Sequence, residues 1–133
     1  MNPNYSRIAE RARHRCEFCR APEAINNFPF EVEHVIPTSQ EGTNEDSNLA
    51  LACRSCNVFK RDYVVELDIV TNQLVSLFHP RNDNWETHFF VDAESGVILG
   101  LSPTGRVTIV RLRMNSSRQV TARLAWSRLG LFP

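Results

Sequence analysis

The chain has 133 residues, of which 42% are hydrophobic and 23% are charged. Both values are near the averages of globular proteins, so they exclude a largely disordered or fibrous chain. No apolar run approaches the roughly 20 residues that a membrane-spanning helix needs, and the first residues contain no apolar stretch typical of a signal peptide. We therefore expect a cytoplasmic protein with one ordinary domain, or a small module with an extension.

The 15 basic and 15 acidic residues cancel in sum but are distributed unevenly along the chain. The last acidic residue is Glu94, and the segment after it contains six arginines: Arg106, Arg111, Arg113, Arg118, Arg123 and Arg128. A separated basic segment is typical of a nucleic-acid contact. The same arginines could instead form a solvated helical face that pairs with the acidic half, and charge alone leaves both interpretations open.

Turn residues and apolar spacing predict a helix, two strands and a second helix in the first half of the chain. Apolar residues about one helical turn apart predict a short helix within residues 4–15. Residues 30–36 alternate in part and are expected to form a strand that stops at Pro37, and the apolar residues 49–52 predict a second strand. A polar loop is expected between these strands, and a short helix is expected at about residues 56–62.

Two hairpins followed by two helices are expected in the second half. Residues 63–78 are rich in Val, Leu and Ile with a polar break, which favours a hairpin, and residues 89–101 contain two apolar runs around a glycine turn. Ser102 followed by Pro103 is typical of a helix start, although alternating apolar residues after it leave a strand open. Residues 117–129 predict a final amphipathic helix.

Four cysteines stand in two C-x2-C pairs, Cys16 with Cys19 and Cys53 with Cys56. A reducing cytoplasm disfavours disulfides. Two pairs with this spacing can complete a tetrahedral thiolate site, so the cysteines predict a structural zinc ion. The 33 residues between the pairs are more than a simple zinc finger has, and we expect the chemistry of the protein to lie in this insert.

Residues in and after this insert suit phosphodiester cleavage, which needs a base and a cation. Glu33 and His34 end the first expected strand, so their side chains should point to opposite faces. A neutral imidazole near pH 7 can activate a water molecule, and the amide oxygen of Asn57 is a ligand that suits Mg²⁺ or Mn²⁺. Lys60 and Arg61 could place positive charge on a phosphate, or they could belong to a solvated helix face.

Over residues 13–62 the chain resembles an HNH endonuclease of the zinc-stabilised ββα-metal type. The motifs that carry this resemblance are the first C-x2-C pair, then EVEHVIP beginning at residue 31, then NLALACRSCNVFK beginning at residue 48. They occur in the order and with the spacing typical of the family. The segment after residue 78 is more loosely similar to the C-terminal extension of bacterial HNH proteins.

The resemblance implies a role for each matching residue. His34 matches the general base, and Asn48 matches the asparagine that braces the loop between the two strands and helps to hold the base. Asn57 and Glu33 match the protein ligands of the catalytic divalent ion, although the family more often has Asp at the position of Glu33. The structural zinc ligands are matched by Cys16, Cys19, Cys53 and Cys56.

These observations together predict an α+β protein with a ββα-metal nuclease core, a four-cysteine zinc site and a C-terminal extension of β-hairpins and helices. Residues 1–62 would form the core with its N-terminal helix, and residues 63–133 would pack on this core without forming an independent domain. The predicted function is metal-dependent hydrolysis of nucleic-acid phosphodiester bonds. The alternative is a zinc-stabilised module that binds nucleic acid or protein without turnover.

The implied cofactors are a structural zinc ion and a catalytic Mg²⁺ or Mn²⁺, and the implied partner is nucleic acid, with DNA favoured over RNA. No membrane partner is expected. A small nuclease can dimerise to cut both strands or act alone as a nickase, and the sequence leaves both open.

Overall fold

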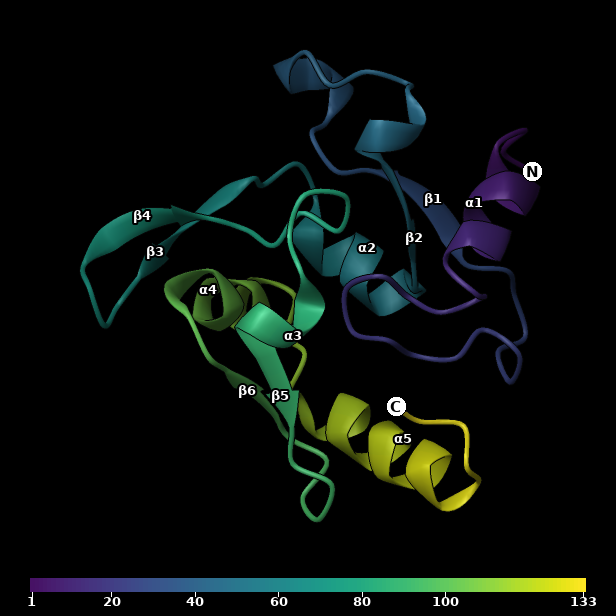
Figure 1. Ribbon diagram of the computed structural model, residues 1–133, viewed down its shortest axis with the longest axis vertical. Helices are drawn as coiled ribbons and strands as arrows, with labels where there is room; N and C mark the ends of the chain where they lie inside the picture. The colour runs from purple at the N-terminus through teal and green to yellow at the C-terminus, as the bar shows by residue number, and fades with distance from the viewer.

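Three two-stranded antiparallel sheets and five α-helices make up the protein, as the computed structural model of residues 1–133 shows (Figure 1). The expected α+β class is therefore confirmed. None of the helices combines the length and the apolar character that a membrane span requires.

The first half of the chain forms a ββα unit preceded by a short helix. Helix α1 spans Tyr5–Arg11, strands β1 and β2 span Glu31–His34 and Leu49–Ala52, and helix α2 spans Arg54–Lys60. Strand β1 pairs antiparallel with β2, so that His34 lies opposite Leu49. All four residues of β2 are buried, whereas Glu31 of β1 is exposed and its other three residues are partly exposed. The expected helix, strands and order are confirmed, and two short 3₁₀ turns lie in the loop between the strands.

Helix α2 begins two residues earlier than the sequence indicated. It starts at Arg54 because Cys53 is its N-cap, and the sulfur of Cys53 accepts a hydrogen bond from the backbone N–H of Cys56. Cysteine is not among the residues usually preferred at this position. The expected start at Cys56 was therefore wrong, and the cap that moves the start is part of the cysteine pair itself.

Two hairpins and three helices make up the second half. Its elements are β3 Val65–Asp68, β4 Gln73–Ser76, α3 Trp85–His88, β5 Phe89–Val91, β6 Ile98–Gly100, α4 Pro103–Arg111 and α5 Ser117–Arg128. Both expected hairpins are confirmed. The segment after Ser102 is a helix and not a strand, and the Ser102 hydroxyl caps it by accepting from the N–H of Gly105 at 3.0 Å. The four-residue helix α3 was not predicted.

Ion pairs attach helix α4 to strand β3. The Arg106 guanidinium donates two hydrogen bonds to the Asp68 carboxylate, at 3.1 and 2.9 Å. These hydrogen bonds hold the pKa of Asp68 well below its usual range. Arg111 donates to Glu66 at 3.2 Å. Two of the six C-terminal arginines thus pair with acids of the first 94 residues, as one of the two open interpretations expected.

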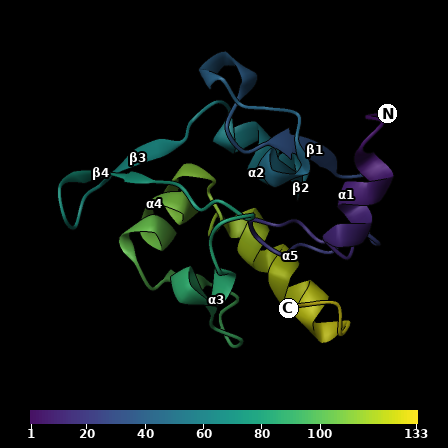
Figure 2. The ribbon, with the colours of Figure 1, turned by 45° about the horizontal axis from the view of Figure 1, so that its top comes forward.

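A single hydrophobic cluster crosses the expected boundary between residues 1–62 and 63–133. It contains 22 buried residues drawn from both segments. The indole N–H of Trp85 donates to the backbone oxygen of Phe18 at 2.8 Å, and Arg20 bonds Glu86 at 2.7 Å. In both views the first turns of α5 lie beneath α2 (Figures 1 and 2). The later elements therefore help to position the ββα unit.

Candidate metal centre and candidate active site

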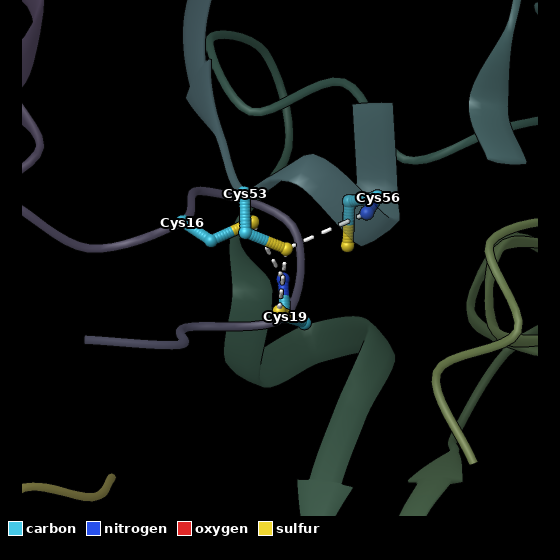
Figure 3. Close-up of side chains that lie close together, drawn as sticks. All are labelled: Cys16, Cys19, Cys53 and Cys56. Carbon is cyan, nitrogen blue, oxygen red and sulfur yellow. Dashed lines mark hydrogen bonds between the residues drawn. The ribbon is translucent and has the colours of Figure 1, made fainter. Parts of the chain in front are cut away.

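The four cysteines converge at one buried point where the loop after α1 meets the start of α2 (Figure 3). Their sulfur atoms all lie within 4.8 Å of one another, and the Sγ atoms of Cys19 and Cys53 are 3.7 Å apart. A zinc ion with Zn–S bonds of about 2.3 Å sets the sulfur atoms of a tetrahedron about 3.8 Å apart. The cluster therefore has the composition and the spacing of a structural zinc site.

Hydrogen bonding within the cluster favours a thiolate at Cys16. The N–H of Cys19 donates to the sulfur of Cys16 at 3.5 Å, and the N–H of Cys56 donates to that of Cys53 at 3.4 Å. Burial alone would raise the pKa of Cys16, but its hydrogen bonds hold it well below the usual value. The same neighbours raise the pKa values of Cys19 and Cys56. Four buried thiolates need a cation to coexist, and zinc fits this donor set.

A buried arginine lies in the electrostatic field of this cluster. Arg123 of α5 is 1% exposed, and it donates to the backbone oxygens of Gly96 and Met114. Burial lowers the pKa of Arg123, while the cysteines act in the opposite direction. The burial of Arg123 was not predictable from the sequence, where nothing distinguishes it from the exposed Arg118 and Arg128 on the same helix.

The side of helix α2 that carries Asn57 and Lys60 packs against the face of β1 that carries Glu31 and Glu33. Glu31 and Glu33 are two residues apart on the strand and so share one face. The side-chain amide of Asn57 donates to the Glu31 carboxylate. One helical turn later, the Lys60 ammonium lies 3.5 Å from Glu33 Oε1. The structure thus brings the expected ligands Glu33 and Asn57 to one strand–helix face, but gives each a different protein partner.

Lys60 does not lie on the surface where a phosphate contact was expected. Its side chain is 1% exposed, and its ammonium donates to the backbone oxygen of Val35 at 2.9 Å. Burial lowers the pKa of Lys60 and raises that of Glu33. Lys60 is therefore a buried partner of Glu33, because α2 turns this side toward β1. Arg61, one residue later, is exposed.

His34 lies at the end of β1, and the loop between the strands holds its ring. Its Nε2 atom is 2.7 Å from the amide oxygen of Asn44. Because an amide oxygen only accepts hydrogen bonds, Nε2 carries a hydrogen in this contact, and in the neutral imidazole Nδ1 then keeps its lone pair. The side chain is partly exposed, so water can reach it. Asn44 was missed by sequence reasoning, since polar residues are common in loops.

Asn48 joins the two ends of that loop. Its side-chain oxygen accepts from the N–H of Ile36 at 2.9 Å, and its side-chain nitrogen donates to the backbone oxygens of Ile36 and Thr43 at 2.9 and 2.8 Å. The residue is buried. This geometry suits the bracing role that the resemblance implied for it.

We expect Asn48→Ala to lower the free energy of unfolding by about 2–4 kcal/mol, because it removes three hydrogen bonds and leaves partly buried backbone groups of Ile36 and Thr43 unpaired. Urea unfolding followed by circular dichroism measures this change. Asn27→Ala, at an exposed loop position, serves as the control and should change the stability by less than about 0.5 kcal/mol. Equal effects of the two substitutions would contradict the bracing role.

The Glu33–Lys60 pair should show strong coupling in a double-mutant cycle. Lys60→Met or Glu33→Leu alone leaves a buried charge unpaired and should cost about 3 kcal/mol each, whereas the double variant should recover part of this loss. The exposed pair Arg7–Asp46 is the matched control, with an expected coupling under about 1 kcal/mol. Additive single effects at Glu33 and Lys60 would show that the two side chains do not interact.

Comparison with known proteins gives one match. Residues 16–62 match the model of the family described as HNH endonuclease. No curated protein and no solved structure matched the chain. The matched segment begins at the first cysteine of the metal centre and contains both strands of the ββα unit and helix α2.

Proposed function

We propose, on the premise that residues 16–62 match the model of the HNH endonuclease family, that the protein hydrolyses phosphodiester bonds of nucleic acid, with DNA as the favoured substrate. The observation that carries the proposal is the environment of His34. A partly exposed imidazole with one nitrogen engaged by Asn44 and the other free stands at the end of the strand that also carries Glu31 and Glu33.

His34 acts as the general base in this proposal. The hydrogen bond from Nε2 to Asn44 fixes the tautomer and the orientation of the ring. The free Nδ1 atom takes a proton from a water molecule, which then attacks the phosphorus. General-base catalysis of this kind contributes roughly 10²- to 10⁴-fold to a rate. Asn44 is a positioning residue, because it acts through His34.

The divalent ion would be held by the carboxylate of Glu33 and the amide oxygen of Asn57. Glu31 supplies a further carboxylate on the same face, hydrogen-bonded to Asn57. Oxygen donors of this kind suit Mg²⁺ or Mn²⁺. When bound, such an ion neutralises charge on the phosphate and on the departing 3′ oxygen. The 3.5 Å contact from Lys60 is loose and leaves Glu33 lone pairs free for an ion.

One observation favours the alternative, a zinc-stabilised binding module without turnover. Both expected ligands of the divalent ion already have protein partners, since Lys60 contacts Glu33 and Glu31 contacts Asn57. A module of this kind needs the cysteine cluster and the buried ion pair only to maintain its fold. It has no use for an imidazole held with one free nitrogen, which is why we favour the enzyme.

Incubation of the zinc-loaded protein with supercoiled plasmid tests the proposal. We expect nicked or linear DNA in the presence of Mg²⁺ or Mn²⁺, and the ratio of the two products reports whether one strand or both strands are cut. The resemblance to the family implies ends with a 5′-phosphate and a 3′-hydroxyl, which a ligase can reseal. A folded, zinc-containing protein that cuts neither duplex DNA, single-stranded DNA nor RNA would favour the binding module.

A further inference from the structure

A groove of about 480 Å³ lies between helix α2 and the start of helix α5. Its walls carry two arginines, three serines, a glutamine and no acidic residue. The first turns of α5 lie beneath α2 in both ribbon views (Figures 1 and 2). The groove thus joins the family-matched segment to the C-terminal elements, and its polar lining is positively charged.

The arginines of this groove, Arg113 and Arg118, differ from three of the other four in the C-terminal segment, and the fourth, Arg128, is exposed but lies outside the groove. Arg106 and Arg111 pair with carboxylates, and Arg123 is buried against backbone oxygens. Arg113 and Arg118 are exposed, and neither makes a salt bridge or a side-chain hydrogen bond. Their guanidinium N–H groups are therefore free to bind an anion.

Arg113 is also held in place. Its guanidinium lies over the ring of Phe59 of α2, 4.4 Å from the ring centroid. Stacking of this kind orients a guanidinium without neutralising its charge. A planar cation fixed beside a groove loses less conformational entropy on binding a phosphate than a free side chain does.

The groove lies across α2 from the candidate active site. With 100° per residue, Phe59 lies about 200° around the helix from Asn57, measured through Val58. The exposed Arg54 and Val58 lie on the outward ridge between these two positions. A helix with its side chains is about 10–12 Å wide, and a nucleic-acid strand carries a phosphate about every 3.4 Å along the helix axis. A strand crossing this ridge would therefore place one phosphate in the groove and another, a few nucleotides away, at Asn57.

We infer that the α2–α5 groove binds the sugar-phosphate backbone of the nucleic-acid substrate through Arg113 and Arg118. The inference rests on the proposed function for the nature of the ligand. It gives the elements after residue 63 a role in binding, because Arg113 and Arg118 extend the nucleic-acid-binding surface beyond the family-matched ββα unit. The contacts are to phosphates, so they add affinity and salt dependence without sequence preference.

Binding of a fluorescent 30-base-pair DNA duplex, measured by anisotropy in a His34→Ala background at several salt concentrations, tests this surface. The double variant Arg113→Gln/Arg118→Gln should lower the slope of log affinity against log salt by about 2 and weaken binding about 10- to 30-fold at 0.15 M salt. Arg113→Lys/Arg118→Lys keeps the charge and should keep the slope. Arg128→Gln removes one exposed charge outside the groove, and it should leave both quantities nearly unchanged.

Equal slopes for the glutamine double variant and the parent would overturn the inference, as would no binding to any nucleic acid. An RNA duplex of the same length identifies which backbone the groove prefers, and arginine-dependent binding of either duplex supports the inference. Because no cleavage is needed in this assay, the proposed function can fail while the surface stands. If the protein cuts plasmid DNA but its DNA affinity does not depend on Arg113 and Arg118, the proposed function stands and the inference about the groove fails. Zinc content and thermal unfolding confirm that each variant is folded.

Discussion

Replacing His34 with alanine is expected to lower the rate of plasmid cleavage about 10²- to 10⁴-fold while zinc stays bound and the fold is retained. The loss follows from the geometry of the ring, because the substitution removes the free imidazole nitrogen at the end of the strand that carries Glu31 and Glu33. The side chain is partly exposed and bonds only to a loop residue. Its removal should therefore cost little stability.

His14→Ala is the matched control for this experiment. His14 is an exposed histidine that precedes the first cysteine, and its ring bonds Glu23. Its loss should leave the cleavage rate within a few-fold of the parent. Cleavage by His34→Ala at the parental rate would exclude His34 as the base. Equal losses in the two variants would indicate damage to the fold and not to catalysis.

The second large effect is expected from Cys19→Ala, which should abolish zinc binding and the cooperative unfolding transition. Structural zinc contributes an apparent binding free energy of about 10–16 kcal/mol, comparable with the whole stability of a typical domain at about 5–15 kcal/mol. The core around the cluster contains residues from both halves of the chain, so the loss should extend beyond the ββα unit. Zinc analysis together with calorimetry measures both effects.

Val58→Ala is the control for the cysteine variant, because Val58 lies on α2 with about half of its surface exposed. It should keep one zinc ion and a transition near that of the parent. A Cys19→Ala protein that unfolds cooperatively at the parental temperature would show that the cluster does not maintain the fold. Retention of a full equivalent of zinc by Cys19→Ala would show that the other three cysteines suffice.

The backbone of the ββα unit and the metal centre were predictable because their signals are local. The spacing of the cysteine pairs fixed the cluster, and alternating or apolar runs located β1 and β2. The start of α2 was misplaced, since the thiol of Cys53 caps the helix where sequence rules look for a serine or an aspartate. Helix α3, with four residues, is too short to leave a periodic pattern.

The partners of the charged side chains were much harder to predict. Lys60 was expected at the surface, because lysine is almost never fully buried unless it is paired. Its burial depends on how α2 packs on β1, which brings it to Glu33. The same holds for Asn44, whose contact with His34 spans ten residues of loop. Tertiary packing determines which side chains pair in this way, and the periodicity of the sequence does not predict these contacts.

The C-terminal arginines illustrate this limit most clearly. Their segregation from the acidic residues is visible in the sequence, but it fits both a nucleic-acid contact and internal pairing. The structure divides them residue by residue: Arg106 and Arg111 pair with acids, Arg123 is buried, Arg113 and Arg118 remain free at one groove, and Arg128 is exposed outside it. Internal pairing therefore accounts for Arg106 and Arg111, and a nucleic-acid contact is left open to Arg113 and Arg118.

The central claim is that one metal ion maintains the fold while a different ion supports cleavage by His34. The most direct test is a titration of Mg²⁺ or Mn²⁺ into zinc-loaded protein in otherwise metal-free buffer, with plasmid nicking and zinc content measured in the same samples. The account predicts nicking that rises from zero and saturates with added Mg²⁺ or Mn²⁺, at a constant one equivalent of zinc. Cleavage without added divalent ions, or no cleavage at any concentration by folded protein, would contradict it.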